Sequence, residues 1–241
     1  MNRDHRERPV STCRKDLIRR ARRQRTIRVP HKLNGLLQIL PRFFNRRPLR
    51  VRARELVLTY NRKFAMKILD VGCGINKLPG SLGIDRNPSS RADVLVDLDR
   101  FPYPFADSSF DALQAIHVIE HVSDVIRSME EFHRLVRPGG EVFIVTPHYT
   151  DFSSFCDPTH RWHLNSFSLR YFGDDNAGYG YYSHAKFQEI STRVKLLALW
   201  RWLGFELLVN AFPRFRRFWE YYLCYIVRGK VIEWKLRVIK K

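Results

Sequence analysis

The sequence predicts an α/β fold built on an open, mostly parallel sheet, and three observations support this prediction. Short apolar segments that read as strands alternate with helical or turn-forming segments between residues 66 and 147. One of them, EVFIVTP at 141–147, is almost continuously apolar, as expected for a strand that is buried on both faces. The composition, with 44% hydrophobic and 13% aromatic residues among 241, suits one domain of ordinary size with appendages.

The expected strands of the first half are short, and several end in or next to an acidic residue. They are 67–72 (KILDVG), 81–85 (SLGID), 92–98 (ADVLVDL) and 111–116 (DALQAI), followed by 141–147. A helix is expected over 117–136, because apolar residues recur there at helical spacing and an Arg-Pro-Gly-Gly sequence then ends the pattern. The C-terminal part predicts a strand near 187–198, a helical aromatic segment near 206–226 and a last strand over 230–239.

Positive charge is concentrated at the two ends of the chain. The net charge is +19 overall, with +16 in residues 1–63, −6 in 64–185 and +9 in 186–241. We therefore predict a basic N-terminal extension over 1–63, a tail plus a helix, and a folded domain over 64–241 with an inserted polar and aromatic segment at 148–183. The basic ends favour an anionic membrane surface, nucleic acid or phosphorylated molecules as partners, and the alternative is a solvated basic tail.

The cysteines and the hydropathy pattern indicate no oxidising compartment, secretory signal or membrane span. The four cysteines, Cys13, Cys73, Cys156 and Cys224, form no CxxC pair, so they indicate neither a zinc knuckle nor a redox pair. The basic N-terminus has no apolar segment behind it, and no uninterrupted apolar run reaches about 18 residues. We expect a cytoplasmic protein, with peripheral association at a membrane as an alternative, and the oligomeric state is left open.

The loop after the first strand has the residues of a site for a nucleotide-like ligand. Asp70, Gly72, Cys73 and Gly74 follow the strand, and the glycines allow a tight turn and close approach of the backbone to a ligand. A dinucleotide site would carry GxGxxG, but Asn76 stands at the third glycine and the acid before the loop would repel a pyrophosphate. A P-loop is excluded, because no GxxxxGK[ST] sequence occurs.

Further residues at the ends of neighbouring strands open onto the same rim of the sheet, where ligands of open α/β sheets bind. Asp85 ends the second strand, and its carboxylate can bond both hydroxyls of a ribose. Asp97 and Leu98 end the third strand, where an acid and a backbone amide can read the edge of an adenine. The residues that we assign to this cofactor site are Asp70, Gly72, Cys73, Gly74, Asp85, Arg86, Asp97, Leu98, Ala115 and His117.

The motifs DVGCG, GID, VDLD, FPYPFADSSFDALQAIHVIEHV and LVRPGGEVFIVTP resemble the class I S-adenosylmethionine-dependent methyltransferases, particularly the type 11 group, over about residues 66–150. The resemblance implies a Rossmann-like, seven-stranded sheet with an antiparallel last strand and S-adenosyl-L-methionine as cofactor. It implies that Asp70 and the glycine loop bind the methionine end, Asp85 the ribose, and Asp97 with Leu98 the adenine. The chain departs from the family in its first helices, which must be short, because only RNPSSRA separates strands two and three. The basic extension could cover the face left bare.

Histidines gather where the methyl acceptor is expected, after the fourth and fifth strands. We take His148 and His160 as catalytic candidates, because a histidine of ordinary pKa can deprotonate a hydroxyl or amine at neutral pH. In the alternative, the DPTH sequence that ends at His160 forms a turn that caps a neighbouring loop. We predict a site without a metal. The spacing of His117, Glu120 and His121, with His160 as a fourth ligand, leaves a divalent metal site as the other alternative.

The sequence as a whole predicts a methyltransferase that acts on an O or N atom of a small-molecule, glycan or lipid-linked acceptor. The segment FPRFRRFWEYYLCYIV at 212–227 reads as a helix packed on the sheet or, alternatively, as a patch that sits in anionic lipid headgroups. A different class is a nucleic-acid-binding protein with a secondary or silent methyltransferase core, and an RNA methyltransferase would combine the two. No RNA-binding signature occurs, and IHVIEH stands where many nucleic-acid amino methyltransferases carry Asn-Pro-Pro-aromatic.

Overall fold

The computed structural model describes residues 66–173 and 182–240. The chain divides into two compact units, 1–47 and 48–241, and every described residue belongs to the second. The predicted basic extension over 1–63 therefore lies outside the described residues, and its boundary stays a prediction. Among the residues that the structure describes, no helix is both long and apolar enough to cross a bilayer.

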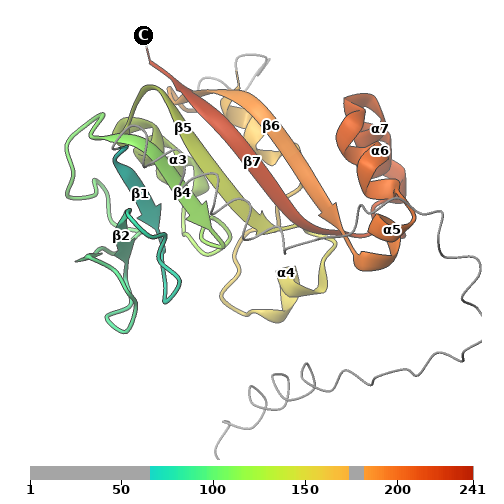
Figure 1. Ribbon diagram of the computed structural model, residues 1–241, viewed down its shortest axis with the longest axis horizontal. Helices are drawn as coiled ribbons and strands as arrows, with labels where there is room; N and C mark the ends of the chain where they lie inside the picture. The colour runs from blue at the N-terminus through green and yellow to red at the C-terminus, as the bar shows by residue number, and fades with distance from the viewer. Residues whose placement is uncertain (1–65, 174–181, 241) are drawn as a thin grey trace, which may run out of the picture. The chain divides into compact units, whose positions relative to one another are not determined.

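Seven strands form one sheet in the order β3-β2-β1-β4-β5-β7-β6 (Figure 1). Their bounds are β1 Ile68–Val71, β2 Leu82–Asp85, β3 Val94–Leu95, β4 Phe110–Ile116, β5 Val136–Pro147, β6 Lys186–Leu196 and β7 Gly229–Ile239. β7 lies between β5 and β6 and runs antiparallel to both, whereas the other neighbouring strands pair in parallel. The predicted α/β class, a Rossmann-like seven-stranded sheet with an antiparallel last strand, is confirmed.

The described helices lie around the second half of the sheet. They are α3 Val125–Leu135, α4 Phe152–Cys156, α5 Ala198–Trp202, α6 Phe205–Ala211 and α7 Pro213–Phe218, with the 3-10 helix η1 Ser168–Phe172 and the π-helix η2 Trp219–Leu223. Met129, Phe132 and Leu135 of α3 are fully buried and join the main core beneath the sheet. Turns alone connect β1 to β2 and β2 to β3, so the first helix, predicted to be short, is absent. The aromatic segment near 206–226, predicted as a single helix, is broken into α6, α7 and η2.

The helix predicted from His117 begins eight residues later, and this correction has a local cause. His117 adopts φ 56°, a left-handed conformation that an α-helix does not contain. Asp124 then caps α3, because its side chain accepts a hydrogen bond of 2.9 Å from the backbone amide of Arg127. His117 and Glu120 therefore sit in turns that follow β4, and not on one face of a helix.

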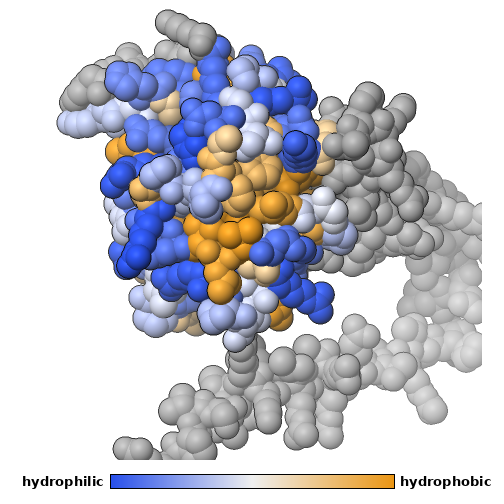
Figure 2. Space-filling model, turned by 90° about the vertical axis from the view of Figure 1, so that its left-hand side faces the viewer, coloured by the Kyte–Doolittle hydropathy of each residue, from blue (hydrophilic) through white to orange (hydrophobic). Residues whose placement is uncertain are grey.

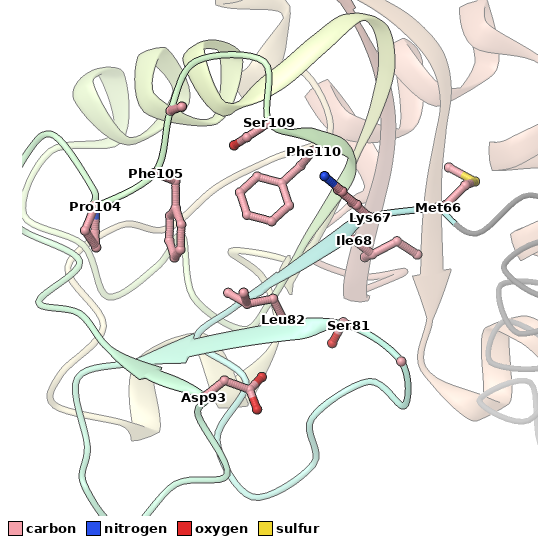
Figure 3. A pocket seen from close by; sticks show the side chains of 12 residues that line it. Met66, Lys67, Ile68, Ser81, Leu82, Asp93, Pro104, Phe105, Ser109 and Phe110 are labelled. Atoms are coloured by element: carbon pink, nitrogen blue, oxygen red, sulfur yellow. The ribbon is translucent and has the colours of Figure 1, made fainter.

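No described helix covers the edge of the sheet at β2 and β3. Figure 2 views the molecule from this side and shows a hydrophobic patch with a polar surround. A pocket of about 740 Å³ opens at the amino ends of β1, β2 and β4, where Ile68, Leu82, Phe105 and Phe110 line it (Figure 3). Ligands of open α/β sheets bind at the opposite, carboxyl ends of the strands, so we do not assign this pocket to the reaction.

Candidate active site

Asp70 is the structural anchor of the glycine loop that follows β1. Its side chain is buried, and Oδ2 accepts a hydrogen bond of 2.7 Å from the amide of Leu78. Oδ1 accepts a hydrogen bond of 2.8 Å from the side-chain amide of Gln114, which pairs with Asp70 in the register of β1 and β4. Sequence reasoning missed Gln114, since no motif marks it and only the strand register brings it to the loop. The predicted contact between Asp70 and a ligand ammonium stays a prediction.

The two glycines of the loop have different surroundings. Gly72 and Gly74 adopt φ 61° and 52°, in the region that favours glycine. A Cβ atom on Gly72 would lie 2.4 Å from Cγ2 of Val118, whereas one on Gly74 would meet nothing within 4 Å. The backbone at Gly74 therefore faces open space, which a closely approaching ligand requires.

Cys73 lies between these glycines with its thiol buried. Burial, followed by the negative charges of Asp70 and Asp85, raises the pKa of the Cys73 thiol to about 11. The thiol is therefore neutral at physiological pH and lacks the thiolate that reacts as a nucleophile. The Cys73 side chain therefore packs inside the loop. Its predicted contact with the cofactor would then be made by the backbone.

Asp85 joins the end of β2 to the glycine loop. Oδ2 accepts a hydrogen bond of 2.9 Å from the amide of Gly74, and Oδ1 accepts one of 2.8 Å from the amide of Asn87. A carboxylate has about four lone-pair sites, so each oxygen can still accept from a ligand hydroxyl. The adjacent vicinal hydroxyls of a ribose fit this arrangement. Arg86 is exposed immediately beyond the acid.

The residues that we predicted for the adenine, Asp97 and Leu98, lie just past β3, next to β2. Asp97 is half-exposed, and its Oδ2 lies 3.1 Å from Nε of Arg100. Leu98 is half-buried against the main core, and its carbonyl accepts a hydrogen bond of 2.9 Å from the hydroxyl of Tyr103. Ala115 at the end of β4 is fully buried, so only its backbone could serve a ligand. The residues present thus fit an adenosine group along the rim from Gly74 to Leu98.

His148, predicted as a general base, is fully buried just after β5. Its Nδ1 lies 2.7 Å from Oγ1 of Thr150, and its Nε2 lies 3.3 Å from both carboxylate oxygens of Glu220. A Cβ atom on Gly229 would approach the His148 ring to 2.5 Å, so the ring is tightly enclosed. This geometry favours a structural role, because a general base must come within hydrogen-bond reach of its substrate. Sequence reasoning missed Glu220, whose only signal is an acid inside an aromatic segment.

His160, the second catalytic candidate, belongs to a separate cluster with Glu120 and His121. One ligand-type atom from each of these three residues lies within 4.8 Å of the others. The His160 side chain is only 8% exposed, and the rings of His121 and His160 lie 4.6 Å apart. Three of the four residues in the spacing argument thus lie together, through turns and not through a helix, whereas His117 is not part of the group.

A second pocket of about 480 Å³ lies beyond the end of β5. Aromatic side chains form much of its wall, and two arginines and an acid add charge. Its lining residues are Tyr149, Asn165, Phe167, Arg170, Arg217, Glu220, Tyr221 and Tyr225. Pockets of this size that combine aromatic walls with polar groups occur as small-molecule sites. It is the candidate acceptor pocket on the side of the sheet where the acceptor is expected.

Comparison with known proteins finds relatives for the segment that contains Asp70, Asp85 and Leu98. Residues 69–144 match the family model of a methyltransferase domain. The chain is 32% identical over 98 residues to a demethylmenaquinone methyltransferase of Chlorobaculum parvum, a match that covers 34% of this chain and 41% of the relative. It is 31% identical over 108 residues to cycloartenol-C-24-methyltransferase 1 of Oryza sativa subsp. japonica, covering 35% and 31%. The chain thus spans less than half the length of these curated relatives.

A solved structure supports the fold beyond the matched segment. The YcgJ protein of Bacillus subtilis superposes with a TM-score of 0.53 at 13% identity, covering 79% of this chain and 99% of that protein. The matched segment runs from β1 into β5 and contains Asp70, the glycine loop, Asp85 and the turns after β4. Residues 69–144 of this chain therefore match a methyltransferase domain, consistent with the class I S-adenosylmethionine-dependent methyltransferases of the type 11-like group.

Proposed function

We propose that this chain transfers a methyl group from S-adenosyl-L-methionine to an O or N atom of a small-molecule, glycan or lipid-linked acceptor. The observation that carries the proposal is the rim at which Asp85 holds the amide of Gly74 while the backbone of Gly74 faces open space. The bound cofactor supplies an electrophilic methyl group on a sulfonium sulfur. The chain's residues position it, with Asp85 at the ribose and Asp97 and Leu98 at the adenine.

Positioning can account for much of the rate in such a reaction. Methyl transfer is an in-line displacement: the acceptor lone pair bonds to the methyl carbon, the carbon–sulfur bond breaks and its electron pair stays on the sulfur of S-adenosyl-L-homocysteine, and the acceptor proton goes to a base or to water. Holding two reactants in the correct geometry contributes up to about 7–11 kcal/mol to lowering the barrier. A buried His148 is therefore no obstacle to the proposal, since a dedicated general base adds only a factor of about 10²–10⁴.

The relatives favour a small organic acceptor over a nucleic acid. They are named for demethylmenaquinone and cycloartenol. The aromatic walls of the pocket lined by Tyr149, Phe167 and Tyr225 suit an acceptor with an apolar ring or chain. Exposed Arg217 in the same wall suits an anionic group on that acceptor.

Calorimetric titration of the full chain with S-adenosyl-L-methionine tests the proposal. We expect binding by the parent protein and at least about a tenfold loss, or roughly 1.4 kcal/mol, for Asp85→Ala. Asp107→Ala removes an exposed carboxylate before β4, at the other end of the sheet, and should bind as the parent does. Absence of binding by the folded parent would overturn the proposal and favour the nucleic-acid-binding class.

We further propose that the acceptor is reached at an anionic lipid surface. The segment 198–228 exposes many large apolar side chains, which we call the aromatic face. They are Leu199, Trp202, Leu203, Leu207, Leu208, Phe212, Phe218, Tyr221, Tyr222, Tyr225 and Ile226. So many large exposed apolar side chains within one segment are typical of an interaction site. The helices beneath it bury only a small second core around Val209 and Trp219.

Charge supports a lipid surface as the partner of the aromatic face. The exposed basic residues in this segment are Arg201, Arg214, Arg217 and Arg228. Its two acids face inward, since Glu206 accepts a hydrogen bond from the amide of Leu196 and Glu220 is buried beside His148. Aromatic side chains with interspersed arginines suit the interface between anionic headgroups and acyl chains.

Co-sedimentation with vesicles tests this surface. The full chain should pellet with vesicles that contain phosphatidylserine and less so with phosphatidylcholine alone. The double variant Trp202→Ser with Tyr221→Ser should lose most of the binding, whereas Leu95→Ser, which changes another exposed apolar side chain on β3, should not. Equal binding by both variants at low salt would assign the attraction to other basic residues and overturn the aromatic face as the contact.

A further inference from the structure

Three side chains that follow β4 and α4 converge on one point with unsatisfied ligand atoms. A carboxylate oxygen of Glu120 and one ring nitrogen each of His121 and His160 lie within 4.8 Å of one another. Glu120 is 1% exposed, and its Oε2 has no hydrogen-bond partner among the described residues. A buried carboxylate oxygen without a partner is costly, so the cluster lacks a group that would satisfy it.

The His160 ring is oriented so that it presents a lone pair to this cluster. Its Nδ1 lies 3.0 Å from the backbone carbonyl oxygen of Ser154. A carbonyl oxygen can only accept, so Nδ1 carries the proton and donates it. In the neutral ring, Nε2 is then the free acceptor. Fixing one nitrogen of a histidine in this way is how proteins orient the other toward a metal.

His121 is oriented by a chain of two hydrogen bonds. Its Nδ1 lies 2.9 Å from the hydroxyl oxygen of Thr159, and that hydroxyl lies 2.7 Å from Oδ1 of Asp157. A carboxylate accepts only, so Thr159 donates its proton to Asp157 and accepts from His121 Nδ1. The Nε2 atom of His121 is left with its lone pair. Both histidines of the cluster thus expose the same ring nitrogen.

His117 orients the carboxylate from outside the cluster. Its Nδ1 lies 3.1 Å from Oε1 of Glu120, which is the oxygen opposite the unpartnered Oε2. His117 therefore occupies one side of the carboxylate and leaves the other side for a ligand. The alternative raised from sequence spacing, in which His117 is itself a metal ligand, is replaced by this positioning role.

The backbone holds the two ligand-bearing segments together. The carbonyl of Glu120 accepts hydrogen bonds from the amides of Arg161, at 2.7 Å, and Trp162, at 3.2 Å. The indole of Trp162 donates a further hydrogen bond of 2.8 Å to the carbonyl of Val122. The cluster is therefore preorganised by contacts that do not depend on a bound group.

We propose that Glu120, His121 and His160 bind one divalent transition metal ion, with Zn²⁺ as the preferred ion. Two imidazole nitrogens and one carboxylate oxygen form a donor set that suits zinc better than calcium or magnesium, which prefer oxygen ligands. Three protein ligands leave a coordination position open, as in catalytic and not structural zinc sites. Asp157, whose Oδ2 lies 4.0 Å from Nε2 of His160, is close enough to assist through a water.

The open position gives the ion a role in the proposed reaction. The site follows β4 and therefore lies on the rim to which the acceptor is assigned. A coordinated hydroxyl of the acceptor would lose its proton more readily, so the site selects an oxygen acceptor. This last step rests on the proposed methyltransferase function, whereas metal binding itself does not.

Cobalt absorption and zinc calorimetry test the proposal without an activity assay. The tag-free full chain is treated with chelator, dialysed and titrated with Co²⁺, then with Zn²⁺. We expect a visible d–d absorption band that saturates at one equivalent of Co²⁺ per chain and that disappears when Zn²⁺ displaces the Co²⁺. His121→Ala and His160→Ala should each weaken binding by about 100-fold, and Thr159→Val by about 10-fold or more through the lost support of His121. His184→Ala, an exposed histidine outside the cluster, is the matched control.

The outcomes separate the metal site from its alternatives. Absence of both the cobalt band and the zinc heat in a chain that circular dichroism shows to be folded would overturn the proposal. An equal loss of affinity in His184→Ala and His160→Ala would assign the ion to adventitious surface histidines and overturn it as well. Binding of S-adenosyl-L-methionine is measured separately. A result that overturns the proposed function therefore leaves the metal site untouched, and a result that overturns the metal site leaves the proposed function untouched.

Discussion

Oδ2 of Asp85 accepts a hydrogen bond of 2.9 Å from the amide of Gly74, so the acid at the end of β2 holds the loop at the end of β1. The two parts of the proposed cofactor site are thus joined directly, even though no helix separates the strands. The loop gains a second brace from Arg91, whose amide donates a hydrogen bond of 2.8 Å to the carbonyl of Gly74. These short connections replace the positioning that a full first helix would give.

Gly72→Ala should destabilise the fold by about 1–3 kcal/mol, because it adds both a clash and backbone strain. The new Cβ would lie 2.4 Å from Cγ2 of Val118, and Gly72 has φ 61°. Urea unfolding followed by tryptophan fluorescence measures the effect. The double variant Gly72→Ala with Val118→Ala should regain the stability that the clash removes, but not the stability that the backbone strain removes. An unchanged unfolding midpoint for the single variant would contradict the packing of this loop.

Cys73 should react with iodoacetamide far more slowly than Cys156. The thiol of Cys73 is buried and its pKa is raised to about 11, so at pH 8 only about one thiol in a thousand is ionised, whereas Cys156 is exposed. Mass spectrometry of tryptic peptides after timed alkylation of the folded chain measures both rates. The rate at Cys73 should rise with pH up to about 11. Equal rates at the two cysteines at pH 8 would show that the loop opens readily.

The placement of the acids and glycines at one edge of the sheet could be predicted because each lies in or directly after a short apolar strand, whereas their binding of a cofactor stays a proposal. In a parallel sheet such positions meet at one edge, so strand ends suffice to bring Asp70 and Asp85 together. The antiparallel direction of the last strand was predicted only from the resemblance to a family. The alternation of apolar and polar residues in a strand indicates which side chains are exposed, but not whether the strand runs parallel or antiparallel to its neighbours. The positions of these residues therefore follow from the predicted strands alone, and they do not depend on a correct prediction of the helices.

The histidine clusters could not be predicted in the same way. The left-handed conformation of His117 ends the helical periodicity that its apolar neighbours suggest, and no local residue preference announces it. Glu220 reaches His148 across 72 residues, a contact set by how η2 packs against the end of β5. Thr159 acquires its role only because the turn after α4 lies next to His121. Such contacts depend on tertiary packing that sequence spacing does not contain.

His148→Ala should lower the free energy of unfolding by about 2–4 kcal/mol, because it leaves a cavity and removes the partner of a buried acid. Glu220 would keep only the hydrogen bond of 3.0 Å from the amide of Ser166. Urea unfolding of the variant, with His163→Ala as a control at an exposed histidine, measures the loss. A variant of parental stability that had lost turnover would instead restore His148 as the general base.

His133 should make the fold less stable at mildly acidic pH. Its Nε2 donates a hydrogen bond of 2.8 Å to the carbonyl of Ile239, and the ring packs edge-on against Phe187. Burial lowers the pKa of His133 below its usual value. The unfolded chain therefore binds the proton more readily than the folded one. The contribution of His133 to stability is fully present at a pH above the pKa of His133 in the unfolded chain. It is lost as the pH falls from there through the lower pKa of His133 in the folded chain.

His133→Gln isolates this effect, because its side-chain amide can still donate to the carbonyl of Ile239 but does not titrate. Urea midpoints are compared for both proteins from about pH 7.5 to about pH 5. The parent should lose more of its stability over this range than the variant, and His184→Gln, which changes an exposed ring, should follow the parent. Parallel curves for the parent and His133→Gln would show that protonation of other groups governs the acid response.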